Sequence, residues 1–409
     1  MLGHGRLDVR SGLGGHRLVG SFFVMSIELS VVIPCLNEAD TLESCIKKAW
    51  QGIRNAGVVG EVIVADNGST DGSQEIAIRN GARVVPVAAK GYGNALMGGI
   101  AEARGQWVLM GDADDSYDFL EIPKFVEKLR QGYALVQGCR LPSGGGRVMP
   151  GAMPFLHRWW GNPMFTVMAR WMFGAPINDV YCGMRAFTKA HYESLDLRCT
   201  GMEFATEMVI KSALFGAKIA EVPITLHKDG RRSHAPHLKT FRDGWRTLRF
   251  FLLYSPRWLF LIPGLVLLVA GACVMAAGGL GLRIGKATLE GHSMLYGAAG
   301  VLIGLQAVFF ALAAKVFGQT EGLLPVDERV NRFFKFFTLE RALVASLLAS
   351  VLAVAMLVWP VWLWAKIGFG PMDYSQTLKV TVPGATLLVA AWQTALSSCF
   401  ISLLGMGRR

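Results

Sequence analysis

The chain has 409 residues, a formal net charge of +11 and a mean hydropathy of +0.38. This length predicts two or three domains, and the apolar residues are concentrated in residues 259–404. Basic loops beside membrane segments explain the positive charge, and the sequence has no nucleic-acid-binding module, so no nucleic-acid partner is predicted. The seven cysteines include no CxxC pair, which argues against a disulfide framework or a zinc site.

Residues 1–24 are rich in glycine and arginine and contain one brief apolar run, Leu18–Val24. This run is too short to span a bilayer and is a poor match to a signal peptide. We therefore predict a disordered leader over 1–24, followed by a soluble domain over 25–237.

Strands and helices alternate through the first half of the soluble domain. Short apolar runs predict the strands, and apolar positions three and four residues apart predict the helices. Such alternation predicts an α/β fold with a mostly parallel, doubly wound, Rossmann-like sheet. The predicted strands are residues 29–34, 61–66, 82–87, 107–110 and 134–139, and the longer predicted helices are 38–54 and 119–131.

An acidic cluster follows the buried strand Trp107–Met110. Asp112 and Asp114 are separated by one small residue, so both can turn toward one cation at the carboxyl end of the strand, where open α/β sheets bind ligands. Their hard oxygen ligands suit Mg²⁺ or Mn²⁺. The alternative is an acidic turn that caps a helix starting near Asp118.

Residues 141–178 interrupt the alternation. The segment Phe155–Phe173 combines aromatic residues, methionines and two arginines, which suits either a buried core or a lipid headgroup interface. Further strand and helix patterns follow at 184–188, 203–215 and 219–226.

The last part of the chain predicts a membrane domain. Residues 238–258 read as amphipathic helix at the bilayer interface, because arginines alternate with aromatics over Phe241–Trp258. Residues 259–409 then contain four apolar stretches of roughly the 20 residues that a bilayer requires. Lysine and arginine gather before the first span and within the second inter-span loop. The positive-inside rule therefore predicts that the soluble domain, that loop and the C-terminus are cytoplasmic. The predicted spans are 259–282, 293–317, 342–364 and 380–404.

Several motifs, taken in order, resemble those of family 2 glycosyltransferases of the GT-A fold. They are Ile33–Glu38 at the end of the first strand, the glycine loop Lys90–Ala95, the Asp112–Asp114 pair and the segment Asp179–Arg185. The branch that these motifs resemble most makes polyprenyl-phosphate sugars, as dolichol-phosphate mannose or glucose synthases do. The membrane part matches that branch by architecture only.

The resemblance implies a nucleotide site. Asn67 stands where the family has a second aspartate, so the sequence does not choose between GDP and UDP. Asn37 also fits the N-cap of the following helix. The implied nucleotide-binding residues are Pro34, Asn37, Glu38, Asp66, Lys90 and Gly91.

The resemblance also implies a metal and an acceptor site. Asp112 and Asp114 match the metal-binding DxD element, with Ser116, Asp115 or water as the third ligand. Arg185 is either a phosphate ligand or the salt-bridge partner of Asp179. Together with Arg140, the two aspartates are the implied catalytic residues. The implied ligands of an acceptor phosphate are Arg140, Arg185, Lys228, Arg232 and Ser233.

The resemblance implies an inverting, metal-dependent transferase that moves a hexose, mannose or glucose, from a nucleotide-sugar to a polyprenyl phosphate at the cytoplasmic face of the membrane. One alternative is a processive polysaccharide synthase. Such enzymes carry a QxxRW signature, and Arg158-Trp159 matches part of it. Another is a non-catalytic membrane accessory protein. The sequence leaves the oligomeric state open, a homo-oligomer included.

Overall fold

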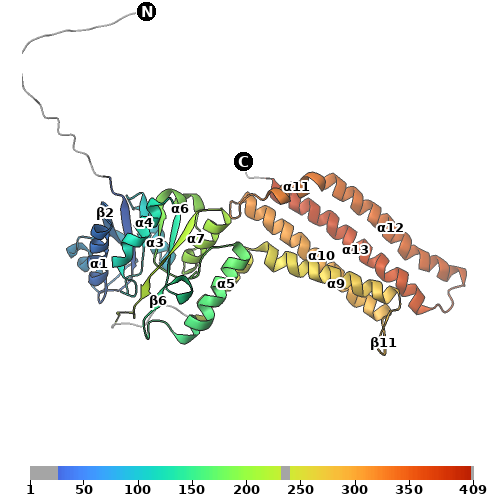
Figure 1. Ribbon diagram of the computed structural model, residues 1–409. Coiled ribbons are helices and arrows are strands. Elements are labelled where there is room, and N and C mark those ends of the chain that lie inside the picture. The colour runs from blue at the N-terminus through green and yellow to red at the C-terminus, as the bar shows by residue number, and fades with distance from the viewer. Residues whose placement is uncertain (1–25, 232–239, 407–409) are drawn as a thin grey trace, which may run out of the picture.

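The computed structural model describes residues 26–231 and 240–406. It consists of a soluble α/β domain followed by a bundle of long helices (Figure 1). The predicted leader, Arg232 and Ser233 lie outside the described residues.

The described residues of the soluble domain form a seven-stranded sheet in the order β3-β2-β1-β4-β7-β5-β8. Neighbouring strands are parallel except at β7, which runs antiparallel to both β4 and β5. The mostly parallel sheet is therefore confirmed, although the sequence did not indicate the direction of β7. The strands are β1 (Leu29–Cys35), β2 (Gly60–Asp66), β3 (Arg83–Pro86), β4 (Trp107–Met110), β5 (Leu135–Cys139), β7 (Arg185–Thr188) and β8 (Ile219–Pro223), with β6 (Arg147–Val148) and β9 (Thr225–Leu226) paired beside the sheet.

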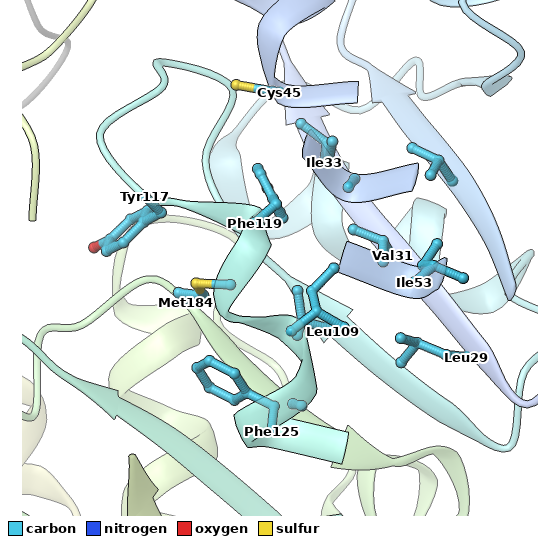
Figure 2. Packing of buried hydrophobic residues seen from close by; sticks show 14 of the residues in the cluster. Leu29, Val31, Ile33, Cys45, Ile53, Leu109, Tyr117, Phe119, Phe125 and Met184 are labelled. Atoms are coloured by element: carbon cyan, nitrogen blue, oxygen red, sulfur yellow. The ribbon is translucent and has the colours of Figure 1, made fainter. Parts of the chain in front are cut away.

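Helices cover both faces of this sheet, as a doubly wound fold requires. Alternate residues of β1 enter different cores: Val31 packs in the cluster under α1 and α4, and Val32 in the cluster under α3, α5 and α7. Figure 2 shows members of the first cluster, among them Ile33, Leu109 and Phe119. The helices of the domain are α1 (Leu42–Asn55), α2 (Ser73–Arg79), α3 (Tyr92–Ala101), α4 (Ile122–Arg130), α5 (Asn162–Phe173), α6 (Lys189–Leu195) and α7 (Glu203–Leu214).

Helix α5 has one buried face and one exposed apolar face. The buried-core interpretation of Phe155–Phe173 is correct for the first face, and the headgroup interface stays a prediction for the second. Phe165 and Phe173 are buried, with ring centroids 5.8 and 5.5 Å from that of Phe251. On the opposite face Val167 and Trp171 are 62% and 68% exposed. A soluble domain rarely exposes such a set of large apolar side chains without a partner surface.

Four helical segments among the described residues are long and apolar enough to cross a membrane, which confirms the four predicted spans. The first and second pack closely through glycines: a Cβ at Gly271 would lie 2.6 Å from the carbonyl oxygen of Gly297. The spans are Arg257–Gly279, which contains α9 (Ile262–Gly279), then α10 (Gly291–Thr320), α12 (Leu339–Lys366) and α13 (Tyr374–Gly405).

Shorter elements mark the two ends of the bundle. Helix α8 (Thr240–Leu253) joins the soluble domain to the first span, and α11 (Glu328–Phe336) lies between the second and third. Helix α11 and the C-terminal end of α13 lie at the end next to the soluble domain, and the hairpin of β10 (Arg283–Ile284) and β11 (Ala287–Thr288) lies at the far end (Figure 1). The soluble domain and the middle loop therefore share one side.

Candidate active site

The carboxyl ends of the parallel strands bring the predicted site residues to one edge of the sheet. Pro34 lies within the end of β1, Asp66 ends β2, and Arg140 follows β5. Asp112 and Asp114 follow β4, which pairs with β1 on the side opposite β2. The chain order reverses at β1, which is the position where open α/β sheets bind ligands.

The two aspartates are held by different donors. The hydroxyl of Tyr92 donates to Asp112 Oδ1 at 2.8 Å, and burial raises the pKa of that tyrosine, which keeps it a donor. The amide and hydroxyl of Ser116 donate to Asp114 Oδ1 at 3.0 and 2.6 Å. Gly183 leaves room for the other oxygen of Asp112, because a Cβ there would lie 2.8 Å from Oδ2.

The electrostatics of this pair fit a divalent cation. Burial, and then the charge of Asp114, raises the pKa of Asp112 from 3.8 to about 6. Two close carboxylates that repel each other in this way are stabilised by a bound cation. Among the described residues no cluster of three or more histidine, cysteine, aspartate or glutamate side chains could hold a metal, so this pair is not part of a larger acidic metal cluster.

The neighbouring acidic residues have other partners. Asp115 accepts from Lys48 Nζ at 2.8 Å and from Ser44 Oγ at 3.0 Å, which leaves it a poor candidate for the third ligand. Asp118 accepts from the amide of Leu120 at 3.0 Å and so caps the turn that leads into α4. The capping interpretation is correct for Asp118, and it leaves the other two aspartates available for a ligand.

Arg231 connects the basic loop that begins at His227, after β9, to the acidic pair of Asp112 and Asp114. Its guanidinium donates to both oxygens of Glu38 and lies 3.6 Å from Asp114 Oδ2. Glu38 and Arg231 are 193 residues apart in the sequence, and no local pattern indicates that they meet. Lys228 of the same loop is exposed.

The predicted helix cap at Asn37 is wrong. Helix α1 begins at Leu42, and Asn37 instead adopts a positive φ of 60°. Its side-chain oxygen accepts from the amide of Thr70 at 2.8 Å, so the residue holds the turn after β2. Asparagine tolerates this left-handed conformation better than most residues do.

Asp66 and Asn67 organise the loops of the predicted nucleotide site. Asp66 Oδ2 accepts from Gln74 Nε2 at 2.7 Å and from the amide of Gly68 at 3.1 Å. Asn67 donates to the carbonyls of Val87 and Ala89 and accepts from the amide of Gly91 at 2.9 Å. An aspartate could not donate those two hydrogen bonds, so the departure from the family motif has a structural use here.

Two predicted phosphate ligands are engaged with the protein itself. Asp179 pairs with Arg140, whose Nε and Nη2 lie 2.7 and 2.8 Å from its oxygens. The predicted alternative pairing of Asp179 with Arg185 is therefore wrong. Arg185 is fully buried and donates to the carbonyls of Cys182 and Ala205, so it presents no surface to a ligand.

Tyr117 is a further site residue that the sequence did not indicate. Its hydroxyl accepts from the amide of Gly183 at 2.8 Å and lies 3.4 Å from Arg140 Nη1. It thereby connects the acidic loop to the Arg140 side of the site. The acidic motif that the sequence presents ends at Asp114, and Tyr117 lies three residues beyond it, so the motif gives no indication of this role.

Comparison with known proteins gives the same family as the motifs. The model of glycosyl transferase family 2 matches residues 30–195, and the family 2 C-terminal transmembrane region matches residues 312–405. The low-salt glycan biosynthesis hexosyltransferase Agl6 of Haloferax volcanii is 34% identical over 382 residues, which cover 92% of this chain and 89% of the relative.

Other similar proteins match smaller parts. A dolichyl-phosphate hexose transferase of Haloferax volcanii is 33% identical over 48% of this chain and 82% of its own. An undecaprenyl-phosphate 4-deoxy-4-formamido-L-arabinose transferase of Pectobacterium atrosepticum is 29% identical over 71% and 88%. The solved glucosyl-3-phosphoglycerate synthase of Mycobacterium tuberculosis, with Mn²⁺, UDP and glucosyl-3-phosphoglycerate, has 25% identity and a TM-score of 0.44, covering 56% of this chain and 79% of that one.

The mostly parallel α/β sheet and the four candidate membrane spans agree with the two family models, and the predicted GT-A-like fold and membrane-protein class are confirmed. The chain belongs to glycosyltransferase family 2 and carries that family's C-terminal transmembrane region.

Proposed function

We propose that this transferase moves a hexose, mannose or glucose, from a GDP- or UDP-sugar to a polyprenyl phosphate at the cytoplasmic face of the membrane. The observation that carries the proposal is the half-buried carboxylate pair of Asp112 and Asp114, in a domain that helix α8 joins to the membrane spans. A soluble acceptor needs no such anchor, whereas a lipid phosphate is presented only at the bilayer surface. The relatives named for dolichyl and undecaprenyl phosphate support the same acceptor class.

On the donor side, Asp112 and Asp114 are the residues that would hold Mg²⁺ or Mn²⁺. The ion supplies charge stabilisation for the departing diphosphate. Tyr92 and Ser116 orient the two carboxylates. The Lys90–Gly91 loop and Asp66 stand at the same edge of the sheet, where they can contact the diphosphate and the nucleoside.

On the acceptor side, a lipid phosphate is already an anionic nucleophile, so the site needs cations rather than a general base. We assign this role to the basic loop with Lys228, Arg232 and Ser233. Arg140 contributes through Nη1, since Asp179 occupies its other nitrogens. Attack opposite the leaving diphosphate converts an α-linked donor into a β-linked product.

The exposed aromatic faces of α5 and α8 support a position at the headgroup layer. Trp171 of α5 contacts Trp258 at the start of the first span, with ring centroids 3.8 Å apart. Phe241 and Trp245 of α8 are exposed, next to exposed arginines. Trp and Arg together are typical of the membrane–water interface.

The test is a donor panel with purified protein. Radiolabelled GDP-mannose or UDP-glucose is mixed with polyprenyl phosphate and Mn²⁺, and the product is extracted into organic solvent. We expect label in a β-linked lipid. Label in a polymer would instead favour the processive synthase suggested by Arg158-Trp159, and no transfer with any donor would favour an accessory protein.

A further inference from the structure

A buried ion pair lies away from the acidic site. Glu207 and Lys211 are one turn apart on α7, both side chains are fully buried, and their charged atoms are 3.1 Å apart. Burying two charges is costly unless additional hydrogen bonds satisfy them. The partners of this pair therefore indicate what it does.

Both members of the ion pair form hydrogen bonds to the main chain of the segment 195–200. Glu207 Oε2 accepts from the amides of Arg198 and Cys199 at 3.0 and 2.7 Å. Lys211 Nζ donates to the carbonyls of Leu195 and Asp196 at 3.0 and 2.7 Å. Together, the two side chains fix the course of the segment 195–200, which has no regular secondary structure after Leu195.

The segment 195–200 packs directly on the glycine loop Lys90–Ala95, which is part of the predicted nucleotide site. The amide of Asn94 donates to the carbonyl of Thr200 at 3.2 Å. A Cβ at Gly91 would lie 2.7 Å from Thr200 O, and one at Gly93 would lie 2.7 Å from Cys199 O. With so little space, any movement of the segment 195–200 moves the loop, and with it Tyr92, the donor to Asp112.

Two further contacts connect the same ion pair to the membrane-anchored part. The hydroxyl of Tyr254, just beyond α8, donates to Glu207 Oε1 at 3.0 Å. Arg198 Nη2 donates to the carbonyl of Glu321, the residue after α10, at 3.1 Å. Tyr254 lies just before the first membrane span, and Glu321 lies just after the second.

We propose that Glu207 is a positioning residue through which the seating of α8 and α10 in a bilayer sets the geometry of the Lys90–Gly93 loop. The inference rests on the proposed function, since it takes that loop as part of the donor site. Loosening Tyr254 or Arg198 lets the segment 195–200 fluctuate, and the nucleotide must then order the loop as it binds. Nucleotide affinity is therefore higher in a bilayer than in detergent.

The experiment compares the affinity for UDP and GDP, with Mn²⁺, of the full chain in lipid nanodiscs and in detergent. Tyr254→Phe and Arg198→Ala each remove one link and keep the buried ion pair. In nanodiscs we expect each substitution to weaken nucleotide binding about three- to tenfold, which is the effect of losing one hydrogen bond. In detergent we expect little change. Arg198→Lys should restore part of the affinity. Tyr374→Phe, at an exposed position of α13, and Arg54→Ala, exposed on α1, are the matched controls.

Glu207→Gln should lose the difference between nanodisc and detergent altogether; if it does not fold, the two single-link variants decide the question. Variants that keep the wild-type ratio of the two affinities, or a wild type that binds equally in both media, would overturn the coupling. A wild type that binds neither nucleotide in either medium would instead reject the proposed donor site.

Discussion

At the scale of single residues, the half-buried carboxylate of Asp112 accepts a hydrogen bond from the neutral hydroxyl of Tyr92 and lies near the negative charge of Asp114. Its pKa of about 6 means that a proton competes with the cation below that pH. We therefore expect Mn²⁺ affinity to rise between pH 5 and pH 7, measured by titration with an electron paramagnetic resonance readout.

The sign for stability is opposite in the metal-free protein. The folded state holds this proton more tightly than the unfolded state does, so the contribution of Asp112 to stability falls as pH rises from 3.8 through about 6. Saturating Mn²⁺ should reverse the trend in thermal unfolding. An affinity for Mn²⁺ that does not change between pH 5 and pH 7 would contradict the assignment of Asp112 as a metal ligand.

Arg140 illustrates how a residue predicted for binding also has a structural role. It is 8% exposed, and Asp179 is fully buried, so removing either partner leaves the other charge buried. We expect Arg140→Ala to lower the free energy of unfolding by about 3–5 kcal/mol. The double variant Arg140→Met, Asp179→Leu should recover much of this stability, as measured by chemical denaturation.

The double variant also separates the two roles of Arg140. If Arg140 contacts the acceptor phosphate, the recovered protein keeps the donor KM of the wild type but shows a raised KM for polyprenyl phosphate. Wild-type acceptor kinetics in a stable double variant would limit Arg140 to its ion pair with Asp179.

At the scale of elements, α5 presents one face to the core and the other outward. Val167 is 62% exposed on the outer face. Val167→Glu should lower transfer to lipid acceptor about five- to tenfold, because it removes apolar contact with the bilayer and adds repulsion from anionic headgroups. Ile78→Glu, at a similarly exposed position of α2, is the matched control. Equal activity of the two variants in liposomes would reject an interfacial position for α5.

Elements that rest on local pattern were predictable from the sequence. The four spans, the strands 61–66 and 107–110, and the aspartate pair follow from apolar runs and neighbouring residues. The antiparallel direction of β7 was not predictable, because it depends on pairing with β4 and β5 across long stretches of chain. Contacts such as Arg140–Asp179 and Tyr254–Glu207 bring together residues 39 and 47 positions apart, and no periodicity indicates them.

At the scale of the whole molecule, the soluble domain and α11 lie at one end of the spans and the β10–β11 hairpin at the other (Figure 1). The basic residues of α11 predict that this shared side is cytoplasmic. In a background with Cys273 and Cys399 replaced by serine, Lys286→Cys in the hairpin should react with an impermeant maleimide added outside intact cells. Lys335→Cys in α11 should react only after permeabilisation, and the reverse pattern would place the active site outside.

The proposed transfer requires that Asp112 and Asp114 hold a divalent ion against the donor diphosphate. Its most direct measurement is the rate of Mn²⁺-dependent sugar transfer to polyprenyl phosphate by Asp114→Asn, beside Asp115→Asn as a control with the same charge change but with Lys48 and Ser44 as partners of the native residue. We predict that Asp114→Asn lowers the rate by at least about 100-fold, that Asp115→Asn keeps most of the wild-type rate, and that EDTA abolishes wild-type transfer until Mn²⁺ is restored. Wild-type transfer that persists in EDTA, or an Asp114→Asn variant as active as Asp115→Asn, would contradict the claim.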